Sequence, residues 1–264
     1  MSTAPKRSDS FNLVKWYLDC VTDEGEVAIV YGTELKWRGV CIVANSVLAG
    51  SEDHVETRTS ISPFQVTREG NSIAVEVPRQ GVAGEWEADS APCERAVYEA
   101  EAGSVKWNCL QPRSRVRLRI ADRRLSGLGY AECVTLTVPP WKLPLDELRW
   151  GRFVSPRNWM VWVDWKGRYS ASFAFADGKE GAAPAVRDAE VAAAGARLRI
   201  EAGFALRSGR IGSTILPHVP RLAKLLPRSL FNIEEQKWCS RGEMRTNDGC
   251  ALGWVIHEVV RWKA

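Results

Sequence analysis

The pattern that decides the fold is clearest in residues 127–138, GLGYAECVTLTV, where apolar and polar side chains alternate. Successive side chains of an extended strand point to opposite sides, so every second residue shares a face. Runs of this period recur along the chain and are separated by glycine, proline, asparagine and aspartate, which predicts β-strands. They lie at Phe11–Asp19, Val27–Thr33, Val40–Ala44, Ser72–Val77, Ala96–Ala100, Ser104–Cys109, Val116–Ile120, Tyr130–Val138, Leu148–Phe153, Met160–Trp165, Ser170–Phe175, Arg197–Ala202 and Gly253–Trp262.

Many short strands in 264 residues predict an all-β fold of barrels or sandwiches, because closing a sheet removes its exposed edges. Hairpin turns are expected at Asp23-Glu24-Gly25, Glu69-Gly70-Asn71 and Asp177-Gly178. The segment Pro139–Pro144 predicts a linker, and a division there gives an N-terminal β-domain, residues 1–139, and a C-terminal β-domain, residues 140–264.

Helical signal is restricted to one or two short segments. His218–Phe231 carries apolar leucines between two prolines that limit a helix to about two turns. Asp188–Ala196 is rich in alanine and fits either a helix or a strand.

Charge and cysteine content exclude several classes of protein. Lys and Arg number 36 and Asp and Glu 32, interspersed, which argues against a nucleic-acid partner. The densest basic run, Arg113–Arg124, alternates with apolar residues, and we interpret it as a solvated sheet face, with an anion-binding patch as the alternative. Seven cysteines without C-x-x-C spacing predict a reducing, cytoplasmic location. The sequence shows no signal peptide and no apolar run of roughly 20 residues, so we expect no stable membrane insertion.

Common catalytic motifs are absent from the sequence. There is no P-loop, no G-x-G-x-x-G and no G-x-S-x-G. The histidines His54, His218 and His257 lack ligand spacing, so we expect no histidine-rich metal site. Tryptophan side chains usually fill cores, and they can also line a pocket for a bulky ligand. The chain has twelve tryptophans, and we expect its partner to be a hydrophobic small molecule.

Two acidic residues stand on otherwise apolar strand faces. Glu132 shares a face with Tyr130 and Val134, and Glu258 shares one with Trp254 and Ile256. Burial of such a carboxyl group raises its pKa unless a cation pairs with it. A carboxylic acid that stays protonated near neutral pH can protonate an alkene or donate to a carbonyl. The alternative for either residue is a structural ion pair with an arginine.

A third candidate cluster depends on whether two neighbouring strands pair. Leu148, Trp150 and Arg152 share one face, and Trp162 lies with Asp164 on the next strand. Side by side, they form either a pocket whose rings stabilise positive charge or a tryptophan core held by an Arg152–Asp164 salt bridge.

Several stretches, in their order along the chain, carry a resemblance to a known family. They are Trp16-Tyr17-Leu18-Asp19, Gly127–Glu132, Leu148-Arg149-Trp150-Gly151-Arg152, Trp162–Trp165 and the closing strand Gly253–Trp262. In them the chain resembles the hydroxyneurosporene synthase (carotenoid 1,2-hydratase)-like family, which is related to lipocalin-like Diels–Alderases and tocopherol cyclases. The resemblance implies two lipocalin-like β-barrel domains, a hydrophobic pocket in or between them, and chemistry without a metal or redox cofactor.

The resemblance also implies site residues. The hydratases carry His-x-Trp-Gly followed by Tyr-x-Asp. In this chain Trp150 and Asp177 match the Trp and the Asp, whereas Leu148 and Phe175 stand in place of the His and the Tyr. The loss of two polar groups favours cyclisation or isomerisation over hydration. The predicted catalytic residues are Asp177, Glu132 and Asp164, and the predicted substrate-binding residues are Tyr17, Tyr130, Leu148, Trp150, Arg152, Trp162, Phe175, Trp254 and Glu258.

Three hypotheses about function follow from these residues. The first is a cofactor-independent cyclase, isomerase or pericyclase of a terpenoid, polyene or polyketide-like molecule. The second is a hydratase, and the third is a carrier that binds a hydrophobic ligand without catalysis. An enzyme requires at least one of the acidic residues to lie unpaired in the pocket with a raised pKa.

Overall fold

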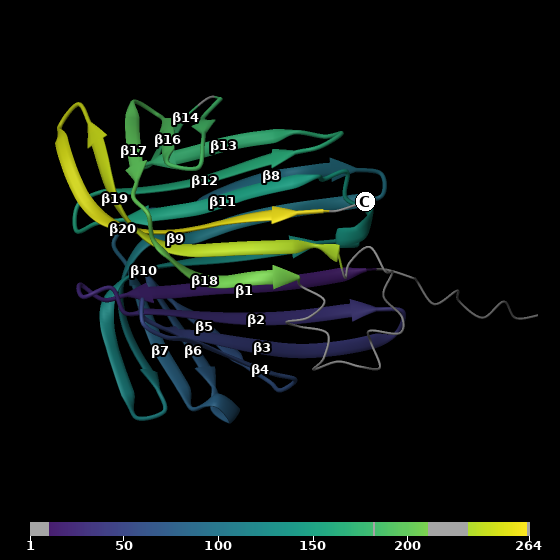
Figure 1. Ribbon diagram of the computed structural model, residues 1–264. Coiled ribbons are helices and arrows are strands. Elements are labelled where there is room, and N and C mark those ends of the chain that lie inside the picture. The colour runs from purple at the N-terminus through teal and green to yellow at the C-terminus, as the bar shows by residue number, and fades with distance from the viewer. Residues whose placement is uncertain (1–10, 182, 211–231, 263–264) are drawn as a thin grey trace, which may run out of the picture.

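The computed structural model describes residues 11–181, 183–210 and 232–262, and these form an all-β protein (Figure 1). Two antiparallel sheets of ten strands each make up the described chain. Two single-turn 3-10 helices accompany them, at Pro78–Gln80 and Pro140–Lys142. The all-β prediction is therefore confirmed.

The first sheet contains the strands of the N-terminal half. They are β1 (Asn12–Val21), β2 (Val27–Trp37), β3 (Val40–Gly50), β4 (Val55–Ser60), β5 (Gln65–Glu69), β6 (Ser72–Val77), β7 (Val82–Ala88), β8 (Cys93–Ala100), β9 (Gly103–Ile120) and β10 (Arg123–Leu136). Their order is β4-β3-β2-β1-β10-β9-β7-β6-β5, and β8 pairs with β9.

The second sheet repeats this arrangement in the C-terminal half. Its strands are β11 (Glu147–Val154), β12 (Trp159–Lys166), β13 (Ala171–Ala176), β14 (Lys179–Gly181), β15 (Ala185–Val186), β16 (Glu190–Ala193), β17 (Ala196–Ile200), β18 (Phe204–Arg210), β19 (Glu234–Thr246) and β20 (Gly249–Arg261). Their order is β14-β13-β12-β11-β20-β19-β17-β16-β15, and β18 pairs with β19. The alanine-rich stretch Asp188–Ala196 is thus mainly strand, and the predicted helix His218–Phe231 lies outside the described residues.

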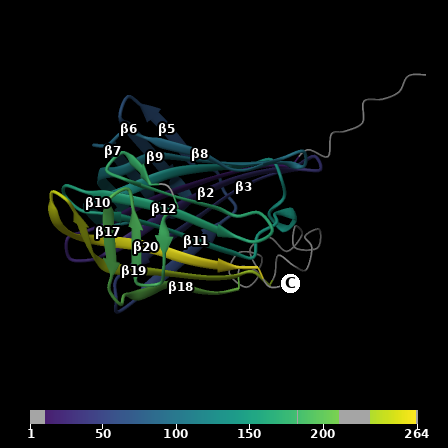
Figure 2. The ribbon, with the colours of Figure 1, turned by 90° about the horizontal axis from the view of Figure 1, so that it is seen from above.

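Each sheet curls into a half-barrel, as Figures 1 and 2 show. The end strands of each sheet do not pair with each other, whereas the sequence argument expected closure. In the first half-barrel polar side chains span the open side: Gln80 donates a hydrogen bond to Asn45, which in turn donates to the Ser62 carbonyl oxygen at 2.8 Å. These contacts satisfy buried polar groups where no strand pairing does so.

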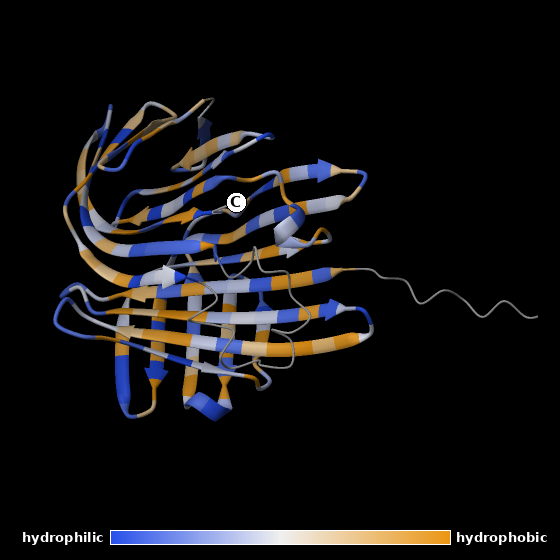
Figure 3. Ribbon diagram, turned by 45° about the vertical axis from the view of Figure 1, so that its right-hand side comes forward, coloured by the Kyte–Doolittle hydropathy of each residue, from blue (hydrophilic) through white to orange (hydrophobic). Residues whose placement is uncertain are grey.

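Side chains alternate between apolar and polar along most strands (Figure 3). In β9, Val116, Leu118 and Ile120 are buried, and Arg117 and Arg119 between them are exposed. The interpretation of the basic run as a solvated sheet face is therefore confirmed.

The hydrophobic core has three parts. One cluster fills each half-barrel, and a third, larger cluster lies between the sheets and draws residues from both. The first sheet ends at Leu136 and the second begins at Glu147, so the predicted domain boundary after residue 139 falls in the connection. Because the halves share a core, their status as separate domains stays a prediction.

A buried ion pair joins the two sheets. Arg152 of β11 donates to both carboxylate oxygens of Asp19 of β1, at 3.0 and 2.6 Å, and its third nitrogen donates to the Trp254 carbonyl oxygen at 2.9 Å. Both side chains are fully buried, and this bidentate geometry is the strongest that arginine and a carboxylate can form. The alternative Arg152–Asp164 salt bridge is wrong, because the register places Asp164 opposite Arg149 and hence on the other face of the sheet.

We expect Arg152→Met to reduce the free energy of unfolding by about 3–5 kcal/mol, because it leaves Asp19 buried without a partner. Chemical denaturation of the purified protein measures this loss. Adding Asp19→Leu should recover much of it, since no buried charge then remains. The control is Arg117→Met, which breaks an exposed pair with Glu85 and should have a small effect. Equal losses for the two single variants would contradict the structural role of the Arg152 pair.

Candidate functional site

The most unusual polar group between the sheets is the carboxyl group of Glu132 on β10. The residue is 7% exposed. Its Oε2 atom accepts hydrogen bonds from the Tyr130 hydroxyl and Trp107 Nε1, both at 2.6 Å, and from Trp150 Nε1 at 3.2 Å. Among the described residues no hydrogen bond or ion pair reaches Oε1. One carboxyl oxygen is thus held in place, and the other remains for a substrate.

Burial raises the pKa of Glu132, and the hydrogen bonds from Tyr130 and Trp107 offset this only in part. The charge of Lys15 also lowers the pKa, but no ion pair with the Glu132 carboxyl group is found among the described residues. The protonated form suits its surroundings, because Oε2 then acts as the carbonyl acceptor and Oε1 carries the proton. Glu132 therefore has the environment expected of a general acid.

Strand register brings the neighbours of Glu132 into two rows. Antiparallel partners point to the same side of a sheet, so one row crosses the first sheet through Cys109, Glu132, Tyr17 and Tyr31. The second row crosses the other sheet through Lys237, Glu258, Trp150 and Val163. The rows face each other, since the Tyr17 and Trp150 rings lie 5.0 Å apart and Lys237 Nζ lies 5.1 Å from the Tyr17 ring.

The pKa of Glu258 is shifted in the opposite direction to that of Glu132. It forms an ion pair with Lys237, whose side chain is 2% exposed. The ammonium group lowers the pKa of Glu258 despite burial, and the carboxylate raises the pKa of Lys237. For Glu258 the structural ion pair is thus confirmed, with a lysine in place of the expected arginine.

A hydroxyl group and several cations lie at the other end of the first row. The Tyr31 hydroxyl is buried and has no hydrogen-bond partner among the described residues. Lys15 Nζ, Lys237 Nζ and the Arg207 guanidinium lie 5.4, 5.5 and 5.2 Å from the Tyr31 ring. A buried polar atom without a partner is uncommon, and this one lies where a polar group of a ligand would be satisfied.

A cleft of about 530 Å³ opens between β8 and β13. Phe173 forms part of its wall, and its ring lies 5.3 Å from the Trp107 ring. Phe175 stacks on the same indole at 6.2 Å. Trp107 donates to Glu132, so contacts between aromatic rings connect the wall of the cleft to the acid.

A second cavity, of about 570 Å³, lies on the opposite face of the second sheet. Trp162, Trp238 and His257 line it, and Ser240 Oγ is 3.2 Å from His257 Nε2. Burial lowers the pKa of His257 to about 4, so the imidazole is neutral near pH 7. His257 is thus a neutral histidine with a hydrogen-bond partner.

The structure separates several of the predicted site residues from Glu132. Trp162 pairs in register with Gly151 and Asp164 with Arg149, so both point away from Trp150, and the expected cluster with Trp150 and Arg152 does not form. Asp164 pairs instead with Lys166 at 3.2 Å. The error arose because neighbouring strands were aligned by sequence alone, and a shift of one residue reverses a face.

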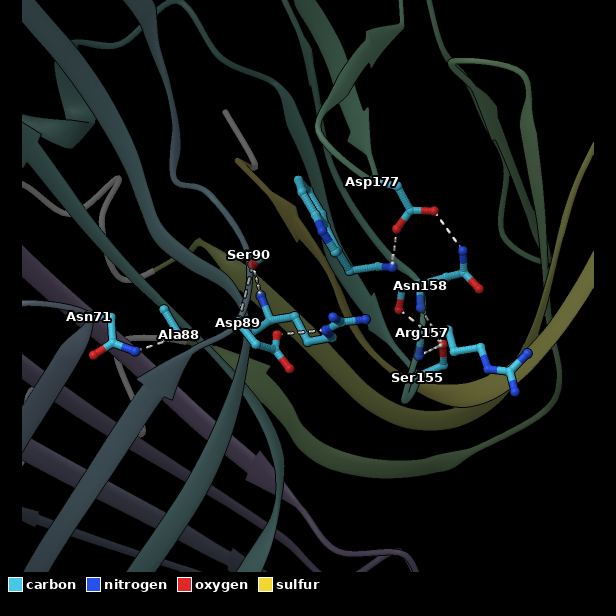
Figure 4. A network of polar contacts seen from close by, with 10 residues as sticks. Asn71, Ala88, Asp89, Ser90, Ser155, Arg157, Asn158 and Asp177 are labelled. Carbon is cyan, nitrogen blue, oxygen red and sulfur yellow. Dashed lines mark hydrogen bonds and ion pairs between the residues drawn. The ribbon is translucent and has the colours of Figure 1, made fainter. Parts of the chain in front are cut away.

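Asp177 is exposed in the hairpin between β13 and β14 (Figure 4). Its carboxylate accepts hydrogen bonds from the Trp159 backbone N–H at 2.8 Å and from Asn158 Nδ2 at 2.7 Å. A φ of 47° places the residue in the left-handed region that aspartate tolerates in tight turns. These contacts describe an exposed residue that stabilises a turn.

The other predicted binding residues belong to the core between the sheets or pack at its edge. Tyr17, Tyr130, Trp150 and Phe175 lie in the core between the sheets, and Leu148 packs against it. Trp254 also packs against this core, and its ring lies on the Asp23–Gly25 turn, where a Cβ atom on Gly25 would lie 2.4 Å from it.

Sequence reasoning missed the residues that complete the site. Trp107 lay in a predicted strand, and its shared face with Cys109 was a usable signal. Lys237 belongs to a strand that was not predicted, because Glu235 and Lys237 resemble a solvated face. Asp19 lay in a stretch that carries the family resemblance, but neither it nor Tyr31 was predicted as a site residue, since their partners lie on the other sheet.

Metal sites and membrane spans were sought in the described part of the chain. No three His, Cys, Asp or Glu side chains gather there as a metal site would require. In the same residues, no helix has the length and apolar character needed to cross a membrane.

Two curled sheets around a shared core define a lipocalin-like protein of two half-barrels. The chain is similar to CghA, crystallised with Sch210972, with a TM-score of 0.64 and 10% identity over 96% of this chain and 89% of that one. It is also similar to a protein of Nitrosomonas europaea assigned as AttH, with a TM-score of 0.62 and 6% identity over 100% and 98% of the two chains. Kievitone hydratase from Nectria haematococca gives 0.53 and 8%, over 94% and 88%.

No protein-family model and no curated protein matches the sequence. At these identities the similarity concerns the fold. The lipocalin-like fold implied by the resemblance is thereby confirmed.

We expect Glu132→Gln to change the pH dependence of stability. In the folded protein Glu132 keeps its proton above its ordinary pKa of 4.5, whereas the unfolded chain releases it. Its contribution to stability is therefore present below pH 4.5 and is lost as the pH rises through the raised pKa. Glutamine cannot titrate, so the variant should lack this decline when the free energy of unfolding is measured from pH 4.5 upward.

Glu258→Gln is the matched control of opposite sign. The lowered pKa of Glu258 makes its contribution present above pH 4.5 and lost as the pH falls through the folded value. The substitution also leaves the buried Lys237 with only its more distant partner, Glu235 at 3.9 Å, and should destabilise the protein near neutral pH. Parallel profiles of the wild type and Glu132→Gln would show that Glu132 ionises normally when folded.

Proposed function

We propose that the protein is a cofactor-independent cyclase or isomerase of a hydrophobic small molecule and that Glu132 is its general acid. The observation that carries this proposal is the buried carboxyl group of Glu132, whose pKa is raised, which forms no ion pair among the described residues and which leaves Oε1 available. The likeness to CghA, crystallised with a small molecule, and to a hydratase supports a ligand-handling role for this fold. The substrate classes that we favour are terpenoid, polyene and polyketide-like natural products.

In the proposed reaction Glu132 Oε1 transfers its proton to an alkene carbon or a carbonyl oxygen of the substrate. The carboxylate that forms is stabilised by the hydrogen bonds that Tyr130 and Trp107 already donate to Oε2. The Tyr17 and Trp150 rings face positive charge that develops on the substrate. A proton lost from another carbon returns to the carboxylate, so the product keeps the mass of the substrate.

The proposed substrate site joins the cleft to the acid. The apolar body of the substrate contacts Phe173, Phe175 and Trp107, and its polar end lies toward Tyr31. Lys15 and Arg207 surround that end with positive charge, which suits an oxygen that carries negative charge. Binding requires the aromatic side chains that separate the cleft from Glu132 to rotate.

The proposed cellular compartment rests on the state of the cysteine thiols. All seven cysteines are free. This supports the proposal of a reducing compartment, the cytoplasm, because pairs of exposed thiols do not persist under oxidising conditions.

Incubation with an extract of apolar metabolites tests the proposal, with heat-denatured protein as the blank. We expect liquid chromatography and mass spectrometry to show a product of unchanged mass. Glu132→Gln should reduce its rate of formation by about 100-fold, the usual contribution of a general acid. Asp177→Asn is the matched control, and it should leave the rate unchanged because Asp177 only caps a turn.

Other outcomes would replace this function. A product heavier by one water would identify a hydratase. A compound that co-purifies with the folded protein but is never converted would identify a carrier. Equal rates for Glu132→Gln and the wild type would remove Glu132 from the mechanism.

A further inference from the structure

Two cysteines stand directly opposite each other on neighbouring strands. Cys93 of β8 pairs in register with Cys109 of β9. Antiparallel partners point to the same face, and Cys93 packs against the core cluster that contains Cys109. Among the strand pairings described, no other cysteine has a cysteine as its partner.

The geometry of this pair suits a disulfide bond. Directly opposed residues of antiparallel strands have Cα atoms about 4.5 or 5.5 Å apart, depending on the hydrogen-bonding pattern. Both separations fall within the range of about 4.4–6.8 Å that a disulfide spans. The two thiols are also hydrogen-bond neighbours, so a bond between the sulfur atoms requires little backbone movement.

The two thiols differ in access. Cys109 is fully buried and Cys93 is half-buried. Burial and the neighbouring Cys93 raise the pKa of Cys109, which makes it a poor first nucleophile. Cys93 is therefore the thiol that a small oxidant reaches, and Cys109 is the one placed to resolve the product.

We propose that Cys93 and Cys109 form an oxidative modification site that hydrogen peroxide converts to a disulfide. The Cys93 thiolate attacks one peroxide oxygen, the O–O bond breaks, and the hydroxide that leaves takes up a proton to become water. The sulfur of Cys109 then attacks the sulfenic acid on Cys93, displaces its oxygen as a second water and loses its own proton. The two thiols are oxidised by two electrons, and one peroxide is reduced to two waters.

The disulfide is also expected to affect the Glu132 site, and this expected effect rests on the proposed function. Cys109 is the register partner of Glu132 and a hydrogen-bond neighbour of the Tyr130 hydroxyl. A bond to Cys93 draws the Cys109 sulfur away from Tyr130, which is the donor to Glu132 Oε2. Oxidation therefore alters the support of the acid, and product formation should fall.

The test uses the full-length wild-type protein, first reduced and then exposed to dilute hydrogen peroxide. After denaturation the oxidised protein should bind two fewer maleimides than the reduced protein and should weigh less by two hydrogen atoms. Tryptic digestion should yield the peptide Gln80–Arg95 linked to Trp107–Arg113, and dithiothreitol should release the two. Cys93→Ser should lose the linked peptide, and Cys250→Ser, which changes an exposed cysteine, should keep it.

Each remaining outcome overturns the proposal. Sulfinic or sulfonic acid on Cys93 beside a free Cys109 would show that the second thiol does not resolve the first. Links between other cysteines, or seven maleimides after peroxide, would show that the pair is not the site. The disulfide is read by mass whether or not the protein converts a substrate, so its failure is distinguishable from failure of the proposed function. If product formation is seen, oxidation should lower it in the wild type and not in Cys93→Ser.

Discussion

The Asp19–Arg152 ion pair is the interaction on which the arrangement of the two sheets depends. Two charges buried away from water are tolerated only when they meet each other with good geometry. Asp19 belongs to the first sheet and Arg152 to the second, so this condition can be met only when β1 and β11 face each other in one register. The same register places Tyr17 opposite Trp150, two residues along each strand.

Two glutamates between the sheets show how the surroundings of a carboxyl group determine its protonation. Glu132 and Glu258 both stand on apolar faces and both lose contact with water. Lys237 reaches Glu258 and keeps it ionised, whereas Glu132 receives only neutral donors. Desolvation therefore dominates at Glu132, and of these two glutamates only Glu132 has a raised pKa.

The tryptophans serve two purposes that their number alone does not separate. Trp107 and Trp150 each contribute an apolar ring to the core and an indole N–H to the acid. Trp86 donates instead to the Asp19 carbonyl oxygen and fills the first half-barrel. Which indole supports the site follows from the partner of its N–H group, and that partner lies on another strand.

The sequence by itself determined the all-β class, the turns, the break near residue 139 and the isolation of Glu132 among apolar residues. These features are local, since a period of two and the turn residues act over a few positions. The tertiary structure alone decided that Arg152 pairs with Asp19, that Lys237 neutralises Glu258, that Trp162 and Asp164 point to the opposite face from Trp150, and that Asp177 stabilises an exposed turn. Such facts depend on register and on contacts between sheets, where a shift of one residue exchanges the two faces of a strand.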